Sequence, residues 1–394
     1  MNKMTLRTLP ALLMIAFSGA ASASAFQLWE QSASGVGNAY AGSAAVADNA
    51  SMAFYNPAGL TQLTGFQFSA GVAGVGPSYK FRNDGGSSPI GGGNGSDAGS
   101  WAAVPNIHLA WQLSPDWSLG FGISSPFGLA TDYKDSNWIG RVQAQKSEIK
   151  TVNYNPSLGY RVNDKVSLGF GINYQTIDAE LTSILGHLKG DDSAWGWNTG
   201  ALFTLSPAMR VGISYRSPIK YTLTGTLNSM PVKADVKLPD TFILSVWQQV
   251  SDRWEAMGDL SYTRWSSLKT LDVYRRDSGS LLPGSEIFNY RNSWRLAWGA
   301  AYQVSDAAKV KFGIAYDRTP TTDAYRSPRV PDNNRVWLSL GGQWNTGKTG
   351  KIDLGYSYLY VKDPSIDRTI AGNTLSGSYN ASAHIVGLQY SVGF

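Results

Sequence analysis

The chain has 394 residues, contains no cysteine and carries a formal net charge of +5. The absence of cysteine excludes disulfide bonds, lipid-modified cysteine and thiolate metal sites. The basic residues form no clustered stripe along the sequence. The positive charge therefore does not indicate a nucleic-acid partner, and we expect none.

The N-terminus has the pattern of a secretory signal peptide. Basic residues precede a short apolar stretch at 9–17, and small residues follow it. The stretch is too short for a spanning helix, and no later segment approaches about 18 consecutive apolar residues. Cleavage can follow Ala23 or Ala25. We favour Ala23, which makes residues 1–23 the signal peptide.

Residues 24–65 form the next segment, which is rich in alanine and glycine. It has short apolar groups but no sustained periodicity. Two interpretations are open at this point. The segment is either a disordered arm or a plug that folds inside the structure formed by residues 66–394.

Residues 66–394 repeatedly alternate apolar side chains with Gly, Ser, Asn or Gln. The alternating runs are 117–123, 166–174, 310–316, 352–360 and 386–394. Period two over eight or more residues predicts strands. A soluble sandwich or propeller with one buried face is the alternative. The aromatic-ended stripes and the terminal Phe394 favour the wall of a transmembrane barrel, with apolar residues toward lipid and small or polar residues toward the lumen.

Turns and loops divide this region into an even number of strands. Six short turns contain Pro, Asp, Asn or Gly: 113–116, 162–164, 205–207, 250–252, 304–306 and 345–350. Seven longer connections fall at 83–100, 131–147, 184–194, 224–234, 268–286, 319–332 and 362–378. Together they predict an all-β fold, an antiparallel barrel of about 14 strands with both ends periplasmic.

Such a barrel belongs in the outer membrane of a Gram-negative bacterium, where closure removes unpaired strand edges from lipid. We expect contact with outer-membrane lipid and lipopolysaccharide. We also expect the barrel assembly machinery to recognise the last strand, which ends at Phe394, and the protein to be a monomer. Many inward positions are Gly, Ser or Ala. They leave room in the lumen and favour the plug interpretation of residues 24–65.

Several motifs carry a resemblance to a known family. The segments 24–30, 34–42 and 56–60, which include Phe26, Asn56, Pro57 and Ala58, resemble the N-terminal hatch of FadL-type long-chain fatty acid transporters. The resemblance continues at 104–108, 125–131, 147–153, 238–240, 261–266, 314–317 and 330–339. It implies a 14-stranded barrel, a hatch at 24–65 inside the lumen, and passive uptake of hydrophobic compounds.

The segment Ser125-Pro126-Phe127-Gly128 matches the kinked third strand of that family. Pro126 cannot donate a ladder hydrogen bond and Gly128 weakens pairing, so a kink or bulge is expected there. Exposing a chain of about 16 carbons to water costs roughly 12 kcal/mol at about 0.8 kcal/mol per methylene. A lateral opening into the bilayer avoids this cost. An ordinary irregularity near a loop is the alternative.

The lumen face predicts an apolar pocket. On the fifth strand the inward residues become apolar where the outward residues become polar, the reverse of a hydrophilic porin. The resemblance implies basic partners for a carboxylate, and strand parity points Arg291 and Arg295 inward. The ligand-binding candidates are Ile177, Leu181, Trp247, Arg291, Arg295 and Trp337.

The chain also departs from the fatty-acid-transporting members. The matching basic position near the end of the fifth strand is Ser183, and loop 184–194 is shorter. Import of monoaromatic or other uncharged hydrocarbons therefore remains open, as do a general porin and a receptor role of the loops. The three histidines lie in no nucleophile motif. We therefore expect no catalytic residue, no metal and no cofactor.

Overall fold

The computed structural model describes residues 25–347 and 349–394. The expected signal peptide lies outside the described residues. The strands, in chain order, are β1 (Phe66–Asn83), β2 (Ala102–Gln112), β3 (Trp117–Ser124), β4 (Gly128–Asp132), β5 (Lys146–Asn163), β6 (Val166–Ser183), β7 (Gly186–Ser206), β8 (Met209–Arg216), β9 (Ile219–Leu227), β10 (Met230–Leu238), β11 (Thr241–Gln249), β12 (Trp254–Thr263), β13 (Thr270–Leu271), β14 (Val273–Arg275), β15 (Glu286–Ile287), β16 (Ser293–Ser305), β17 (Ala308–Asp317), β18 (Arg335–Thr346), β19 (Gly350–Val361), β20 (Ser365–Ile370) and β21 (Asn373–Gly393).

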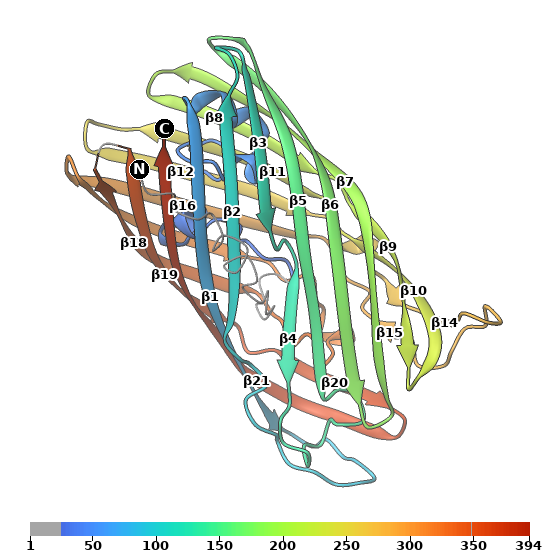
Figure 1. Cartoon of the computed structure of the whole chain (residues 1–394). Helices are drawn as coiled ribbons and strands as arrows, with labels where there is room; N and C mark the ends of the chain where they lie inside the picture. The colour runs from blue at the N-terminus through green and yellow to red at the C-terminus, as the bar shows by residue number, and fades with distance from the viewer. Residues whose placement is uncertain (1–24, 348) are drawn as a thin grey trace, which may run out of the picture.

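These elements form a closed antiparallel barrel of 14 strands, as predicted (Figure 1). Four wall strands consist of two pieces each, namely β3–β4, β8–β9, β10–β11 and β19–β20, and β13 to β15 lie between β12 and β16. The barrel closes where β1 pairs with β21, from Gln67 opposite Gly393 to Asn83 opposite Gly377. No helix among the described residues is long and apolar enough to cross a membrane.

The alternation in sequence becomes the two faces of the wall. On β6, Leu168, Phe170 and Ile172 point outward and are 47%, 49% and 45% exposed, whereas Ser167 and Asn173 point inward and are buried. Aromatic rings border the apolar band near both ends, as in the pair Trp117–Tyr160, 4.4 Å apart, and the pair Tyr174–Trp195, 4.9 Å apart. The outward face is therefore matched to lipid with interfacial girdles.

The structure corrects some of the predicted connections between strands. Each of the six predicted short turns joins two strands, but three of the predicted long loops are mostly strand. In 362–378, β20 pairs with β21 from Ser365 opposite Ser378 to Ile370 opposite Asn373. The ladder of β6 with β7 runs up to Ser183 opposite Gly186, so 184–194 is a tight hairpin. The ladder of β9 with β10 ends at Leu227 opposite Met230. Asn228 and Ser229 between them have φ of 48° and 72°, as a type I′ hairpin turn requires.

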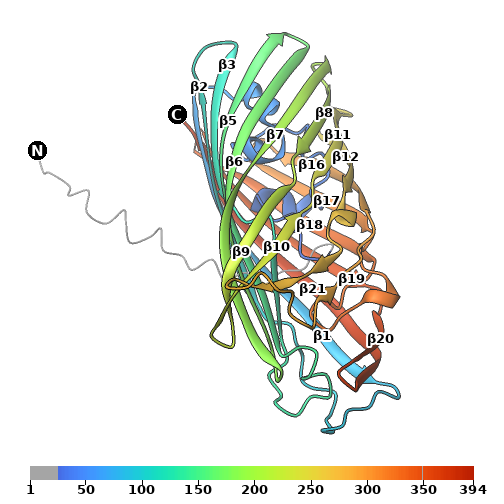
Figure 2. The same ribbon diagram turned by 90° about the vertical axis from the view of Figure 1, so that its right-hand side faces the viewer.

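The hatch is the segment from Ala25 to Gly65. It contains η1 (Ala33–Asn38), α1 (Met52–Tyr55) and η2 (Pro57–Gln62). Figures 1 and 2 show it inside the barrel, toward the end that carries the C-terminus. The lumen is thus filled by the hatch in the half that faces the periplasm.

Wall glycines allow the hatch to approach the strands closely. A Cβ atom on Gly169 would lie 2.2 Å from the nitrogen of Ala58, and one on Gly200 would lie 2.1 Å from Oδ1 of Asn56. The Asn56 side chain is fully buried, and its Nδ2 donates to the carbonyls of Ala44 at 2.8 Å and of Ala201 in β7 at 3.1 Å. Asn56 therefore ties the hatch to the wall where glycine leaves space.

This contact generates a first prediction. Gly200→Ala places a methyl group on the Asn56 amide, so the hatch must shift and Asn56 loses bonds with a combined net value of roughly 1–3 kcal/mol. We expect a barrel that still folds, judged by heat-modifiable gel mobility, but conducts more ions in planar bilayers. The control is Gly258→Ala, because the nearest atom to its added Cβ lies 3.6 Å away. Equal conductance of both variants and the parent would contradict hatch displacement.

Candidate functional site

Apolar cavities lie above the hatch. The outer chamber, of about 570 Å³, is lined by Phe26, Ile177, Leu181 and other apolar residues of β4, β6, β9 and β10. The inner chamber, of about 630 Å³, lies against the hatch and is lined by Leu28, Phe54 and the wall breaks of β3–β4, β8–β9 and β10–β11. Leu238 lines both chambers. The two chambers are therefore neighbours along the lumen.

Arg329 is the only charged residue in the outer chamber's lining within the described part of the chain. Its Nη1 donates to Ser147 Oγ at 3.0 Å and to the carbonyl of Thr182 at 3.2 Å. Burial lowers the pKa of the Arg329 guanidinium, and the carboxylate of Glu286, 3.9 Å from its Nε, opposes that shift. Arg329 projects from loop 318–334 to the carbonyl of Thr182, next to Ser183. Ser183 stands where the resemblance to fatty acid transporters implies a basic residue.

The N-terminal end of the hatch separates the two chambers. The N–H of Leu28 donates to the carbonyl of Pro126, and the N–H of Gly128 donates to the carbonyl of Phe26, both at 2.8 Å. The ring of Phe26 lies 4.8 Å from that of Trp265. Residues 26–28 thus pair with the kinked wall segment through these two backbone bonds, and they lie on its inner side.

The wall has a gap at this point. β3 ends at Ser124 and β4 begins at Gly128. The ladder of β2 with β3 stops at Ile107 opposite Ile123. Among the described strands, residues 102–106 of β2 therefore have no ladder partner on the side that faces β3. A cavity of about 240 Å³ occupies the gap and is lined by Leu28, Ala103, Val104, Ser125, Phe127, Lys150 and Thr151.

The hatch and one wall side chain pair with backbone groups of Ser125 and Phe127 at the gap. Gln31 Nε2 donates to the carbonyl of Ser125 at 2.8 Å. The N–H of Phe127 donates to Thr151 Oγ1 at 3.0 Å, and that hydroxyl donates to the carbonyl of Phe127 at 2.7 Å. The segment is therefore kinked without leaving these groups unpaired in an apolar wall.

A polar belt underlies the inner chamber. It consists of the inward amides Asn153, Asn155, Asn173, Gln175 and Asn198, which are all buried. They bond to one another, as in Asn155 Nδ2 to Asn198 Oδ1 at 3.0 Å. Arg216 joins the belt to the hatch, because its Nη2 donates to the carbonyl of Phe54 at 2.8 Å and its guanidinium lies 3.9 Å from the Phe54 ring centre. An apolar solute moving toward the periplasm would have to displace these bonds.

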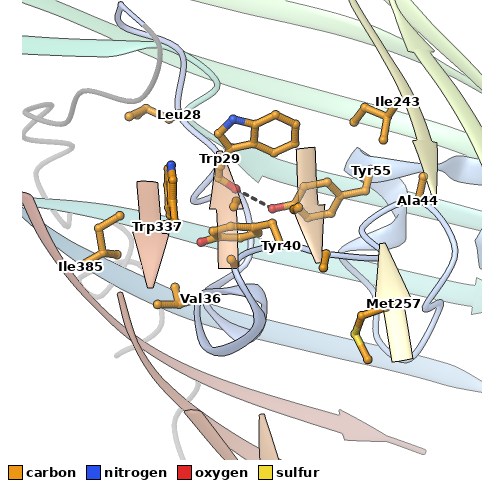
Figure 3. Packing of buried hydrophobic residues seen from close by; sticks show 14 of the residues in the cluster. Leu28, Trp29, Val36, Tyr40, Ala44, Tyr55, Ile243, Met257, Trp337 and Ile385 are labelled. Atoms are coloured by element: carbon orange, nitrogen blue, oxygen red, sulfur yellow. Dashed lines mark hydrogen bonds between the residues drawn. The ribbon is translucent and has the colours of Figure 1, made fainter. Parts of the chain in front are cut away.

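A cluster of aromatic residues, which we call the aromatic seal, fills the space between the hatch and the wall strands β16 and β18. Figure 3 shows Trp29, Tyr40, Tyr55 and Trp337 packed together, with the Tyr55 hydroxyl donating to the carbonyl of Trp29 at 2.7 Å. Arg295 lies 4.7 Å from the Trp29 ring centre and 5.0 Å from that of Trp337, and its Nη2 donates to the carbonyl of Ala39 at 2.6 Å.

The structure distributes the sequence-predicted ligand residues unevenly. Ile177 and Leu181 line the outer chamber. Arg295 and Trp337 lie in the seal just described, and Trp247 lies with its ring 4.0 Å from the guanidinium of Arg210. Arg291 Nε donates to a loop carbonyl, that of Thr319, at 3.2 Å. None of these four lines either chamber.

The structure thus places Arg291 and Arg295 outside the lining of both chambers, and a ligand contact of either residue stays a prediction. Strand parity placed Arg295 inward correctly, but the hatch occupies the lumen at that height. Arg329, Thr151 and Gln31 were missed, since nothing in the sequence shows that a loop arginine turns inward or that a hydroxyl faces the kink. The kinked segment 125–128 and the hatch residues Phe26, Asn56, Pro57 and Ala58 do lie at the chambers or the wall contact.

The kink generates a second prediction. Thr151→Val keeps the side-chain shape but removes the hydroxyl that serves both backbone groups of Phe127. Leaving such groups unpaired costs roughly 1–3 kcal/mol each. We expect faster amide hydrogen exchange at residues 125–128 and a lower thermal unfolding temperature. Thr176→Val, on the outward face of β6, is the control. If the two variants exchange equally slowly in this segment, the Thr151 hydroxyl does not hold the kink.

Comparison with known proteins places this arrangement in a family. The chain is 30% identical to outer membrane protein P1 of Haemophilus influenzae, over 98% of this chain and 99% of that protein. It is 28% identical to a long-chain fatty acid transport protein of Escherichia coli, over the full length of both.

Among solved structures, a Pseudomonas aeruginosa FadL homologue has the same fold, with a TM-score of 0.88 and 24% identity over 94% of this chain and all of the other. The Pseudomonas putida toluene transporter TodX matches with a TM-score of 0.66 and 16% identity over 88% and 94% of the two chains. A family model for outer membrane protein transport proteins matches residues 14–394. This chain therefore belongs to the OMPP1/FadL/TodX family of outer membrane transport proteins.

Proposed function

We propose that this protein takes up hydrophobic compounds passively, long-chain fatty acids foremost, and releases them sideways into the bilayer past residues 125–128. The observation that carries the proposal is the arrangement of two apolar chambers with a wall gap beside the inner one. The similarity to long-chain fatty acid transport proteins over the whole chain supports the substrate class.

The polar belt supports the lateral route. An apolar chain that left through the hatch would pass buried amides and Arg216 before it reached water. Breaking such bonds without replacement is costly, since an unpaired buried polar group costs several kcal/mol in an apolar setting. The wall gap instead leads from an apolar chamber to apolar lipid. A solute that follows this route keeps its surface out of water.

A third prediction tests the route. Replacing both Pro126 and Gly128 by valine should restore pairing of this segment with its neighbours. A side chain at 128 also presses on Leu28, whose Cδ1 would lie 3.0 Å from the new Cβ. We expect the variant to bind oleate but to deliver much less of it to cells than the parent does at equal surface level.

Pro231→Val serves as the control, because Pro231 lies in β10 opposite Thr226 within the continuous ladder with β9. It should leave uptake unchanged. Full uptake by the double valine variant, with the strand shown to be straight, would sink the lateral route.

A fourth prediction concerns the carboxylate. We propose that Arg329 is the partner of an acid in the outer chamber. Arg329→Gln should weaken oleate binding by about tenfold or more, because a hydrogen bond to a charged group contributes roughly 1.5–3 kcal/mol. Binding of toluene should not change. The readout is displacement of a fluorescent fatty acid.

Arg368→Gln is the control, since Arg368 also pairs with Glu286, at 2.7 Å, but does not line the chamber. Equal loss in both variants would assign the effect to Glu286 and its ion pairs. Import of uncharged hydrocarbons is the second candidate function. The observation that favours it is that Arg329 already has protein acceptors in Ser147 and Thr182, so a carboxylate is not required to satisfy it.

A further inference from the structure

The wall contains a second gap, on the other side of β5 and β6. β7 pairs with β9 from Leu188 to Asp191 and with β8 from Asn198 to Ser206. No ladder pair joins residues 192–197 of β7 to residues 217–223 within the described part of the chain. Six residues on one side face seven on the other, and the longer side contains Pro218. Proline cannot donate to a ladder, which fits a break at this place.

Side chains close both ends of this gap. At the lower end, the N–H of Trp197 donates to Ser217 Oγ, and the N–H of Ser217 donates to the carbonyl of Trp197, each at 2.9 Å. At the upper end, the N–H of Thr222 donates to Asp192 Oδ2 at 2.7 Å. The gap is therefore a bounded opening of the ladder and not a frayed strand end.

One row of ladder pairs across β5, β6 and β7 connects the two gaps. The first gap is opposite Thr151 of β5, Thr151 pairs with Ile177 of β6, and Ile177 pairs with Asp192 of β7. Residues from both gaps, Pro126 on one side and Ser217 on the other, line the inner chamber. One cavity thus borders two interruptions of the wall in a single row.

The inner and outer borders of the second gap differ in chemistry. Inside, Ile219 is buried and lines the chamber. It fills the space in front of Gly196, where a Cβ atom would lie 2.8 Å from Ile219 Cγ1. Outside, Trp195 and Trp197 are 67% and 43% exposed at the aromatic girdle. Ile219 therefore stands between the inner chamber and the backbone of Gly196 at the gap. The exposed residues Lys220 and Thr222 also border the gap on the outside.

We propose that the gap between β7 and the β8–β9 strand is a second lateral passage, through which apolar solutes move between the inner chamber and the outer leaflet past Ile219. This inference rests on the proposed role of the inner chamber as substrate space. It adds a second route that uses different strands and does not involve the segment 125–128.

A reversible crosslink tests the passage. In the variant Gly196→Cys/Ile219→Cys, the two Cβ atoms lie no more than about 4.3 Å apart, since one C–C bond of about 1.5 Å adds to 2.8 Å. This distance suits a disulfide. The chain has no other cysteine to compete. Oleate uptake is measured in the oxidised and the reduced protein, alone and together with Pro126→Val/Gly128→Val.

If the passage exists, oxidation of the crosslinked variant lowers oleate uptake, and reductant restores it. Combined with the two valines, the crosslink removes the uptake that the valine variant retains. The opposite perturbation is Ile219→Ala, which should raise uptake in the valine background, whereas Ile213→Ala, on the unbroken ladder opposite Ala201, should not. Unchanged uptake with the crosslink confirmed by mass, together with no gain from Ile219→Ala, would overturn the proposal.

A photoreactive fatty acid separates this outcome from failure of the proposed function. Labelling of the outer-chamber residue Ile177 without labelling at 195–197 or 217–219 would overturn the second passage alone. Labelling of neither region would overturn the proposed function and this inference together. Labelling at both gaps, reduced at 195–197 by the crosslink, is the expected result.

Discussion

The structure depends on one constraint, which is that backbone polar groups in a lipid-facing wall need partners inside the protein. A continuous ladder meets this constraint but leaves no hole through which an apolar solute could pass. At residues 125–128 the ladder is interrupted, and the lost partners are replaced by the carbonyl of Phe26, the N–H of Leu28 and the Thr151 hydroxyl. The hatch is therefore part of the wall at this point as well as the floor of the chambers.

This double role links gating to binding. Residues 26–28 separate the chambers, and Phe26 lines the outer one. A ligand that displaces Phe26 also disturbs the bonds made by residues 126 and 128. In the proposed lateral route, opening of the first gap would be coupled to chamber occupancy through a few backbone bonds, each with a net value of about 1 kcal/mol. Such small terms allow the passage to be closed at rest and opened by the binding energy of an apolar chain.

The sequence specified the barrel well, and the reason is physical. Lipid on one side of the wall requires an apolar residue at every second position, so the alternation can be read from a single sequence. Pro126 marks the break in its strand because proline cannot donate a ladder hydrogen bond. The loops at 184–194, 224–234 and 362–378 were assigned wrongly because Gly, Pro and charged residues interrupt the apolar–polar alternation there, so the pattern no longer separates strand from loop. The place of Arg329 could not be predicted, because it depends on the path of a loop across the lumen. Strand parity gave the inward direction of Arg295 but not its contact with the hatch carbonyl of Ala39.

The two wall gaps differ in what holds their edges. The first is bonded to the hatch through Phe26, Leu28 and Gln31, so movement of the hatch must alter it. The edges of the second are held by wall residues, Ser217 and Asp192, and the side chain of Ile219 lies on its inner side. A rotamer change of one aliphatic residue is fast and costs little compared with breaking several backbone bonds. If both gaps are passages, as we propose, the first is suited to ligand-dependent opening and the second to continuous exchange with the outer leaflet.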